Sequence, residues 1–330
     1  MNRREWIAGA VALAGCGAAE SDAPTAQFPI RRGVNLGNAL EAPNEGDWGY
    51  RIERAHLAAI AEAGFDGVRL PVRWDAHAEA EAPFAIDPRF FRRVDAVIDQ
   101  ALEQGLKVQL DLHHFDALIA DAEGQRRRFI ALWRQIARRY NQHPDALVFE
   151  PLNEPNGDRW RGEALALLQR DALAAIRESN PTRLVVFGPG NWQNIEALRN
   201  WSPPEGANVA VSAHYYEPHA FTHQDAEWLG DSAPRYDRAW GSDAEKRQIA
   251  EHIARAARWG ASRGHAMQLG EFGVNMAVPL EQRAAWTRTV RAACEANEMG
   301  WCAWDFAGAF PIWDRERGRF IPDMLDALFG

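Results

Sequence analysis

Two glutamates follow short apolar runs that lie far apart in the chain. Glu154 lies in LVFEPLNEP at 147–155, and Glu271 lies in MQLGEFG at 267–273. Two carboxyl groups that face each other across a cleft are the minimum equipment for hydrolysing a glycosidic bond. One of them donates a proton to the leaving oxygen, while the other attacks the sugar or activates water. The pair therefore favours a carbohydrate hydrolase, provided that the fold brings the two residues together.

The composition is that of a globular protein with a large core. The chain has 330 residues, of which 47% are hydrophobic, so one large α/β barrel fits its length as well as two smaller domains do. Its formal net charge is -9. Nucleic-acid-binding proteins need basic surfaces to displace counterions from phosphates, so this charge argues against a nucleic-acid partner.

The elements that must position the glutamates alternate regularly from residue 31 onward, as expected for a parallel sheet wrapped by helices. Eight strands are predicted at 33–36, 67–71, 107–112, 146–151, 183–187, 209–213, 266–270 and 301–304. Helices are predicted at 51–63, 88–104, 124–141, 160–179, 191–199, 243–263, 281–298 and 322–329. Eight repeats predict a single-domain (β/α)8 barrel (TIM barrel) over residues 28–330. A doubly wound dinucleotide-binding sheet is disfavoured because no glycine-rich loop follows the first strand.

Barrel enzymes carry their chemistry at the carboxyl ends of the strands, which selects among the polar residues. Hydrogen-bonding and aromatic side chains gather on or just after the carboxyl ends of the predicted strands: Asn35, Asn38, Arg69, His113, His114, Asn153, Glu154, Asn191, Trp192, His214, Tyr216, Glu271, Trp304 and Asp305. A barrel interior is otherwise filled by branched apolar residues. So many polar groups at one end would be costly unless they serve a ligand.

Several of these segments resemble glycoside hydrolase family 5, the cellulase family. The similar segments are RGVNLGNALEAP at 32–43, GVRLPVRW at 67–74, LNEP at 152–155, HYYEP at 214–218, FTHQ at 221–224 and GEFG at 270–273. The resemblance runs from about residue 31 to the C-terminus. Within the family, the chain is most similar to bacterial endoglucanases that accept both β-glucans and β-mannans.

The resemblance implies a retaining endo-β-1,4-glucanase that cleaves cellulose-type chains, mixed-linkage β-glucan and glucomannan by double displacement. Glu154 would be the acid/base and Glu271 the nucleophile, with carboxyl groups about 5 to 5.5 Å apart. Glu154 must stay protonated near neutral pH, which requires burial or a neighbouring negative charge to raise its pKa. Arg69 would keep Glu271 ionised and oriented, because a guanidinium fork fits a carboxylate and stays charged.

The resemblance also assigns supporting roles around the two carboxyl groups. Tyr216 would donate to the nucleophile, Asn153 would hold the sugar 2-hydroxyl, and Trp304 would form the floor under the reacting sugar. The other expected substrate-binding residues are Asn38, His113, His114, Trp192, His214, His223 and Trp228. The histidines are expected to bind sugar hydroxyls, with no metal and no cofactor. Asp225 stands where the near relatives are expected to have a glycine.

Two alternatives remain open. A β-mannanase of the same family would differ in how the site treats an axial rather than an equatorial 2-hydroxyl. A surface glycan-binding lipoprotein without catalysis is less consistent with the intact pair of glutamates. The expected partner in either case is a β-glucan or mannan chain, and we expect the protein to be a monomer.

The N-terminal residues predict export. Residues 1–15 open with Arg3-Arg4 and an apolar run too short to span a bilayer, a pattern typical of a lipoprotein signal peptide with a twin-arginine-like start. Residues 16–27 would be a lipidated Cys16 and a short tether, so the protein would be held on a membrane, in the periplasm or at the cell surface, only through that anchor. An ordinary cleaved signal with an incidental cysteine is the alternative. Cys294 and Cys302 are expected to be buried free thiols rather than a disulfide.

Overall fold

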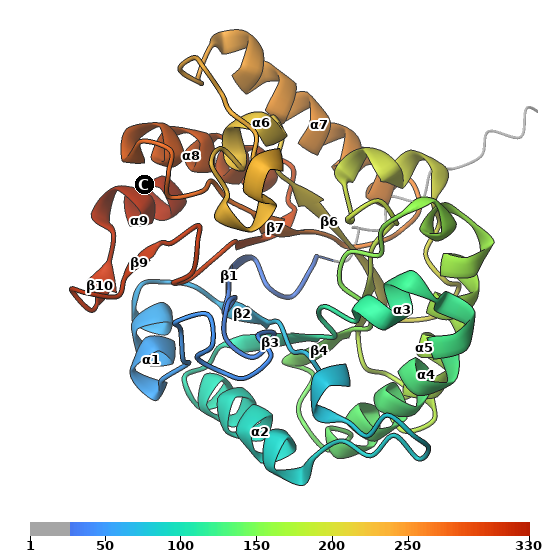
Figure 1. Ribbon diagram of the computed structural model, residues 1–330. Helices are drawn as coiled ribbons and strands as arrows, with labels where there is room; N and C mark the ends of the chain where they lie inside the picture. Colours follow the sequence, from blue (N-terminus) through green and yellow to red (C-terminus); the bar gives the residue numbers. More distant parts are fainter. Residues whose placement is uncertain (1–26) are drawn as a thin grey trace, which may run out of the picture.

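A closed barrel of eight parallel strands forms the centre of the molecule (Figure 1). The computed structural model describes residues 27–330, so the signal peptide and Cys16 lie outside the described residues. The strands are β1 (Arg32–Asn35), β2 (Gly67–Leu70), β3 (Lys107–Asp111), β4 (Leu147–Glu150), β5 (Val185–Phe187), β6 (Val209–Tyr215), β7 (Met267–Phe272) and β8 (Gly300–Ala303). They pair in chain order, and β8 closes the ring on β1 with Gly33 opposite Cys302. The predicted (β/α)8 barrel is confirmed.

Helices surround the barrel in the order that the sequence predicts. They are α1 (Arg54–Glu62), α2 (Pro88–Glu103), α4 (Ala122–Arg139), α5 (Glu163–Arg177), α7 (Asp243–Ala261), α8 (Leu280–Ala296) and α9 (Pro322–Phe329). Several begin at side-chain caps that satisfy free backbone N–H groups. Asp87 accepts from Arg89 N before α2, Asp121 accepts from Gly124 N before α4, and Ser242 forms a capping box with Glu245 before α7.

The helix predicted at 191–199 is wrong. This part of the chain forms only a 3-10 helix, η3 (Ile195–Asn200), which follows a turn. Asn191, Trp192 and Gln193 have φ angles of 59°, 56° and 50°, a left-handed conformation that no right-handed helix contains. The turn places these three side chains near the end of β5 instead of on the outer layer.

The sequence patterns also did not predict several short helices and strands between the main elements. They are α3 (Asp116–Ala120), α6 (His219–Thr222), the 3-10 helices η1 (Asp75–His77), η2 (Asp158–Arg161) and η4 (Glu227–Ser232), and the hairpin of β9 (Trp313–Asp314) and β10 (Arg319–Phe320). Each has six residues or fewer, which is too short to carry a periodic signal. The strand β6 extends two residues beyond its predicted end, so that His214 belongs to it.

All eight barrel strands are almost entirely buried, between the packed interior and the helices. This burial explains why they read as continuous apolar runs rather than as alternating ones. Cys294 and Cys302 are both buried and free, as expected. Within residues 27–330, no helix is long and apolar enough to cross a membrane.

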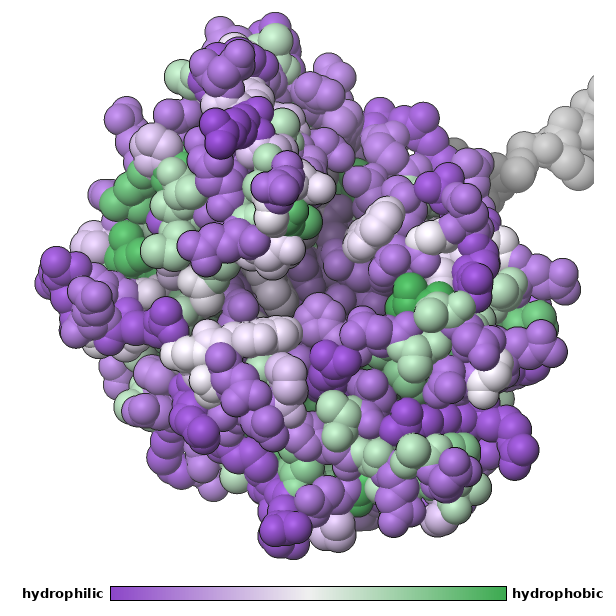
Figure 2. All heavy atoms as spheres, viewed as in Figure 1, coloured by the Kyte–Doolittle hydropathy of each residue, from purple (hydrophilic) through white to green (hydrophobic). Residues whose placement is uncertain are grey.

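Because the strands are parallel, their carboxyl ends meet at one face of the barrel. Figure 2 shows a hollow near the middle of the face in view, edged mainly by hydrophilic and neutral residues. A cavity of about 1050 Å³ is lined by residues that follow the barrel strands, among them both Glu154 and Glu271.

Candidate active site

The fold brings Glu154 and Glu271 together from opposite sides of the barrel. Glu271 lies in β7, paired in register with His214 of β6, while Glu154 lies four residues beyond the end of β4. One carboxylate oxygen of each glutamate and a ring nitrogen of His214 all lie within 4.8 Å of one another. The two acids are thus close enough to act on the same bond.

Two hydrogen bonds, one to its side chain and one from its backbone, hold Glu154 in place. Its Oε1 shares a hydrogen bond of 2.7 Å with His214 Nδ1, and its backbone N–H donates to Gln193 Oε1 at 2.7 Å. Its φ angle is 44°, a left-handed conformation that a non-glycine residue adopts at a free-energy cost. Asn38, His114 and Trp192 share this left-handed conformation. Strained backbone therefore gathers around the carboxyl pair.

Glu271 is bound through both of its carboxylate oxygens. Arg69 Nη1 donates to Oε1 at 2.7 Å, and the Tyr216 hydroxyl donates to Oε2 at 2.9 Å. His214 Nδ1 lies 3.6 Å from Oε2. The preceding residue, Gly270, leaves room for His214, since a Cβ atom there would come within 3.1 Å of its Nε2 and 2.3 Å of Ser212 Oγ.

The surroundings raise the pKa of both acids, and that of Glu154 more. Burial raises the pKa of Glu154 to about 8, with Arg69 opposing the increase and the charge of Glu150 adding to it. Burial also raises the pKa of Glu271 to about 7, while His214 and Arg69 limit the increase. As the pH rises, Glu271 therefore loses its proton first. The hydrogen bonds from Arg69 and Tyr216 favour the ionised form of Glu271, so the intermediate state has Glu271 ionised and Glu154 protonated.

Arg69 is fully buried and binds more groups than the sequence suggested. Besides Glu271, it donates through Nε to Glu150 at 2.6 Å and through Nη1 to Asn35 at 3.0 Å, and its Nη2 lies 2.7 Å from Asp111. Although burial alone would raise the pKa of Glu150, Arg69 holds it below its usual range. Burial raises the pKa of Asp111 to about 8. Glu150 and Asp111 each end an apolar strand, a signal that could have identified them from the sequence.

Asn153 is oriented from both ends of its amide group. Its Oδ1 accepts from Arg69 at 2.7 Å, and its Nδ2 lies 3.2 Å from His113 Nε2. His113 Nδ1 lies 3.0 Å from Asp111, and burial holds the pKa of His113 well below its ordinary value. A neutral His113 that donates from Nδ1 accepts at Nε2, which fixes one N–H of Asn153 and leaves the other available to a substrate hydroxyl.

Trp304 follows β8 and forms one wall of the cavity. Its ring lies parallel to the ring of His113, with an interplanar angle of 5° and a centroid distance of 5.8 Å. Gly37 packs against the ring so closely that a Cβ atom would approach it to 2.9 Å. Nearby, the Asn38 side chain donates to Asp305, and its backbone N–H donates to Glu41. This wall therefore combines one flat apolar surface with several fixed polar groups.

The opposite part of the cavity lies beneath the loops that follow β5 and β6. Trp192 and Trp228 line it and are 52% and 55% exposed. His223 also lines it, with its ring 4.9 Å from that of Tyr216, and burial lowers the pKa of His223 to about 3. A neutral imidazole beside exposed indole faces suits the hydroxyl groups and apolar faces of a sugar chain.

Asp225, which stands where a glycine is expected, lies in the loop that carries Trp228. Asp225 has a φ angle of 50°, which explains why a glycine is expected at this position. Aspartate tolerates this conformation better than most residues. Its backbone N–H donates to Pro234 O at 3.1 Å, and its carboxylate lies 4.0 Å from Arg235 Nε. The backbone hydrogen bond to Pro234 and the ion pair with Arg235 therefore close this loop, with an aspartate in place of a glycine.

The sequence reasoning missed several residues in and around this cavity, among them Glu41, Trp48 and the buried Gln193 behind it. Glu41 is buried, accepts from Ala39 N at 2.9 Å, and has a pKa that burial raises to about 8. Gln193 positions the Glu154 backbone, and Trp48 lines the cavity with 43% of its surface exposed. Glu41 and Trp48 lie in the long loop after β1, where no strand end pointed to them.

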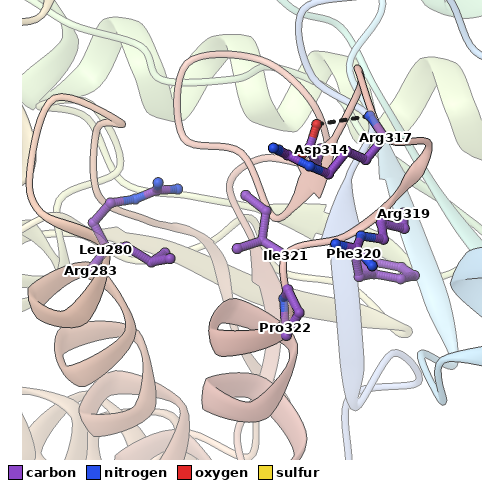
Figure 3. Close-up of a pocket in the computed structure, with 8 residues that line it drawn as sticks. All are labelled: Leu280, Arg283, Asp314, Arg317, Arg319, Phe320, Ile321 and Pro322. Atoms are coloured by element: carbon purple, nitrogen blue, oxygen red, sulfur yellow. Dashed lines mark hydrogen bonds and ion pairs between the residues drawn. The ribbon is translucent and has the colours of Figure 1, made fainter.

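A second, smaller pocket lies between α8, the β9–β10 hairpin and α9 (Figure 3). Arg283, Arg317 and Arg319 line it together with apolar residues such as Phe320 and Ile321. None of the predicted site residues lines this pocket. Arg283 donates through Nη2 to Pro311 O at 2.6 Å, so it supports the loop behind the main cavity.

Comparison with known proteins agrees with this arrangement. The family model of cellulase (glycosyl hydrolase family 5) matches residues 24–309. Endoglucanase H of Acetivibrio thermocellus is 32% identical over 304 residues, which cover 90% of this chain and 32% of that protein. Cellulase/esterase CelE of the same organism is 29% identical over 264 residues, covering 74% of this chain and 31% of that protein. The chain thus spans about a third of the length of these two curated relatives.

Solved structures show the same fold along nearly their whole length. Thermotoga maritima Cel5A in complex with cellobiose has a TM-score of 0.87 and 40% identity, covering 91% of this chain and 98% of that one. Its complex with mannotriose gives the same values. The match of the family model to most of the chain, together with these structures, establishes that the chain belongs to glycosyl hydrolase family 5, the cellulase family.

Proposed function

We propose that this protein is a retaining endo-β-1,4-glucanase that cleaves cellulose-type chains, mixed-linkage β-glucan and glucomannan by double displacement. The observation that carries the proposal is the close approach of Glu154 and Glu271, whose nearest oxygens lie within 4.8 Å. Retaining glycosidases have carboxyl groups about 5 to 5.5 Å apart, whereas inverting enzymes need about 6.5 to 9.5 Å to admit a water molecule. The short separation supports retention.

In the first step, Glu154 donates its proton to the glycosidic oxygen while Glu271 attacks the anomeric carbon. The bond between that carbon and the leaving oxygen breaks, and a glycosyl ester forms on Glu271. The hydrogen bonds from Arg69 and Tyr216 aim the Glu271 carboxylate, and the raised pKa of Glu154 keeps its proton available. Asn153 offers its free N–H to the sugar 2-hydroxyl, a contact that strengthens in the transition state.

In the second step, Glu154 acts as the base. Esterification of Glu271 removes a neighbouring negative charge, so the pKa of Glu154 falls and its carboxylate accepts a proton from water. The resulting hydroxide attacks the anomeric carbon, and Glu271 leaves as a carboxylate. Two inversions at the same carbon give a product of retained configuration. No metal and no cofactor takes part.

The choice of substrate rests on the relatives. Endoglucanase H is named for glucan cleavage, and Cel5A was solved with cellobiose and with mannotriose. A β-mannanase is the competing assignment within the family. Measured kcat/KM on mixed-linkage glucan, carboxymethylcellulose, glucomannan and galactomannan separates the two, and a higher value on galactomannan than on every glucan would replace our assignment.

The mechanism is tested with Glu154→Gln and Glu271→Gln variants. Each should lose nearly all release of reducing ends from mixed-linkage glucan. A fluorinated cellobioside that forms a slowly hydrolysed ester should label the wild-type protein at Glu271, as seen by peptide mass spectrometry. Product of inverted configuration in proton NMR would refute the retaining mechanism, and a wild type that binds glucans without cleaving them would favour a glycan-binding protein.

We also propose that the protein is exported and anchored through a lipid on Cys16, and that it acts as a monomer. The paired arginines at 3–4 and the Leu-Ala-Gly-Cys segment at 13–16 support the anchor. Several acyl chains hold a protein firmly on a membrane, whereas a single chain binds it only marginally. Mass spectrometry of membrane-extracted protein should show a modified mature N-terminus at Cys16, and an unmodified terminus contradicts the proposal.

A further inference from the structure

The smaller pocket between α8, the β9–β10 hairpin and α9 has the make-up of a ligand site. Its volume is about 310 Å³, and within residues 27–330 it shares no lining residue with the main cavity. Small-molecule sites range from about 300 to 1,000 Å³ and combine an apolar lining with a few placed polar groups. Here Leu280, Phe320, Ile321 and Pro322 supply the apolar part of the lining, and arginines supply most of the polar part.

Arg283 of α8 carries a buried charge with an unused hydrogen-bond donor. The residue is 5% exposed, and its Nη2 donates to Pro311 O at 2.6 Å. Its Nε is also buried and has no acceptor among the described residues. In Figure 3 the guanidinium group points from α8 into the space beside Ile321. A buried donor of a charged group is costly to leave unpaired, so an acceptor that enters from the pocket is favoured.

The pocket lining has more positive than negative charge. Asp314 is the one acidic residue in the lining, and Arg317 Nη1 already donates to it at 2.6 Å. Arg319 adds another guanidinium group from β10. Burial lowers the pKa of Arg283 to about 10, with the charge of Asp305 opposing the decrease. On a chain with a formal net charge of -9, this pocket therefore favours an anion.

The apolar part of the lining decides which kind of anion fits. Phe320 packs edge to face against Trp313 at a centroid distance of 5.0 Å, so its ring is held in place. Ile321 N–H donates to Ile312 O at 2.9 Å, which fixes the chain between the hairpin and α9. An inorganic anion gains nothing from such a surface, whereas an organic acid can bury its apolar body there. A surface that is already ordered also loses little conformational entropy on binding.

We propose that this pocket binds an organic carboxylate whose acidic group is attached to a compact apolar body, such as an aryl carboxylate. The carboxylate accepts a hydrogen bond from Arg283 Nε and lies near the charge of Arg319. The apolar body packs against Phe320 and Ile321. This site takes no part in glycoside hydrolysis, and a glucan chain in the main cavity leaves it free.

The test is a fluorine NMR titration of 4-fluorobenzoate with the wild-type protein near neutral pH and at fixed ionic strength. 4-Fluorobenzamide has a similar shape without the charge, and trifluoroacetate has the charge without the aromatic body. We expect 4-fluorobenzoate to bind about 10-fold more tightly than either compound. Equal binding of 4-fluorobenzamide would overturn the anion site, and equal binding of trifluoroacetate would overturn the role of the apolar lining.

Two variants test whether the ligand lies in this pocket. Arg283→Gln loses the buried donor and should weaken binding by about 10-fold, whereas Arg319→Gln loses a screened surface charge and should weaken it by about 3-fold. Arg89→Gln is the matched control, because it removes the same charge from a side chain that is 84% exposed and outside the pocket. Its binding should equal that of the wild type.

The outcomes separate this site from the main cavity. Circular dichroism shows whether Arg283→Gln folds, and if it does not, the exposed Arg319→Gln decides alone. Unchanged binding in the folded variants would overturn the proposal. Cellotetraose added to Glu271→Gln protein should not displace 4-fluorobenzoate, and displacement would place the ligand in the main cavity and refute a second site. None of these results depends on the proposed glucanase activity.

Discussion

Removing the hydroxyl group of Tyr216 should shift the acidic limb of the pH profile. The hydroxyl donates to Glu271 Oε2 at 2.9 Å and lowers the pKa of Glu271. Burial raises the pKa of Tyr216 well above its ordinary value, so the hydroxyl stays protonated and remains a donor. Tyr216→Phe removes a bond that favours only the ionised form of Glu271. The pKa of Glu271 must therefore rise.

The size of the shift follows from the strength of the bond. A hydrogen bond to a charged group contributes about 1.5 to 3 kcal/mol, and one pKa unit corresponds to about 1.36 kcal/mol. The pKa of Glu271 should rise by about 1 to 2 units, from about 7 to the value of about 8 that Glu154 has, or above it. Activity appears as pH rises through the pKa of Glu271 and disappears as it rises through that of Glu154. The active range should therefore narrow from its acidic side.

The assay is kcat/KM on an aryl cellobioside between pH 5 and 10 for the wild type, Tyr216→Phe and Tyr215→Phe. Tyr215 is a matched control, because its buried side chain shares a hydrogen bond with His252 at 3.1 Å and does not line the cavity. Loss of the Tyr215 hydroxyl group should leave both limbs of the pH profile in place. An acidic limb that stays put in Tyr216→Phe, or that moves equally in Tyr215→Phe, would refute the reasoning.

Three further outcomes are expected. Glu150→Gln removes the charge of a buried partner of Arg69, so the free energy of unfolding, measured with urea, should fall by about 3 to 5 kcal/mol. Glu178→Gln, which changes an exposed ion pair, should have almost no effect on it. Gly270→Ala places a Cβ atom within 2.3 Å of Ser212 Oγ and should lower kcat by displacing His214 and Glu271, and full activity would contradict the tight packing. Prolonged dialysis against EDTA should leave kcat/KM unchanged, since the proposed mechanism uses no metal, and a loss restored by a divalent cation would contradict it.

Much of the site could be found from the sequence, because the carboxyl ends of all strands in a parallel barrel lie at the same face. Glu154, Glu271 and Arg69 were selected by their places at the carboxyl ends of predicted strands. In the structure Arg69 binds Glu271, and oxygens of the two glutamates lie within 4.8 Å of each other. Tyr216 and Asn153 likewise lie where they can support the two acids. Their separations and hydrogen-bond partners could not be predicted, since these depend on how far each strand extends and on how each loop turns.

The missed elements share a physical cause. The predicted helix at 191–199 is instead a left-handed turn followed by a 3-10 helix, and local apolar spacing does not reveal positive φ angles at non-glycine residues. Glu41 and Trp48 belong to a long loop whose path depends on Asp305 and Arg315, more than 260 residues away in the chain. Contacts across such separations leave no periodic signal in the sequence.

The sequence by itself determined the barrel, the order of its strands and the pair of glutamates, because apolar periodicity and strand-end placement are local properties of the chain. Only the tertiary structure decided which acid has the higher pKa, which side chains Arg69 binds, and where the cavity extends beyond Trp304. Those properties arise from burial and from charges that distant segments bring together. Both residues carry the same carboxyl group, so it is burial together with neighbours such as Arg69, Tyr216 and Glu150 that sets the pKa of Glu154 apart from that of Glu271.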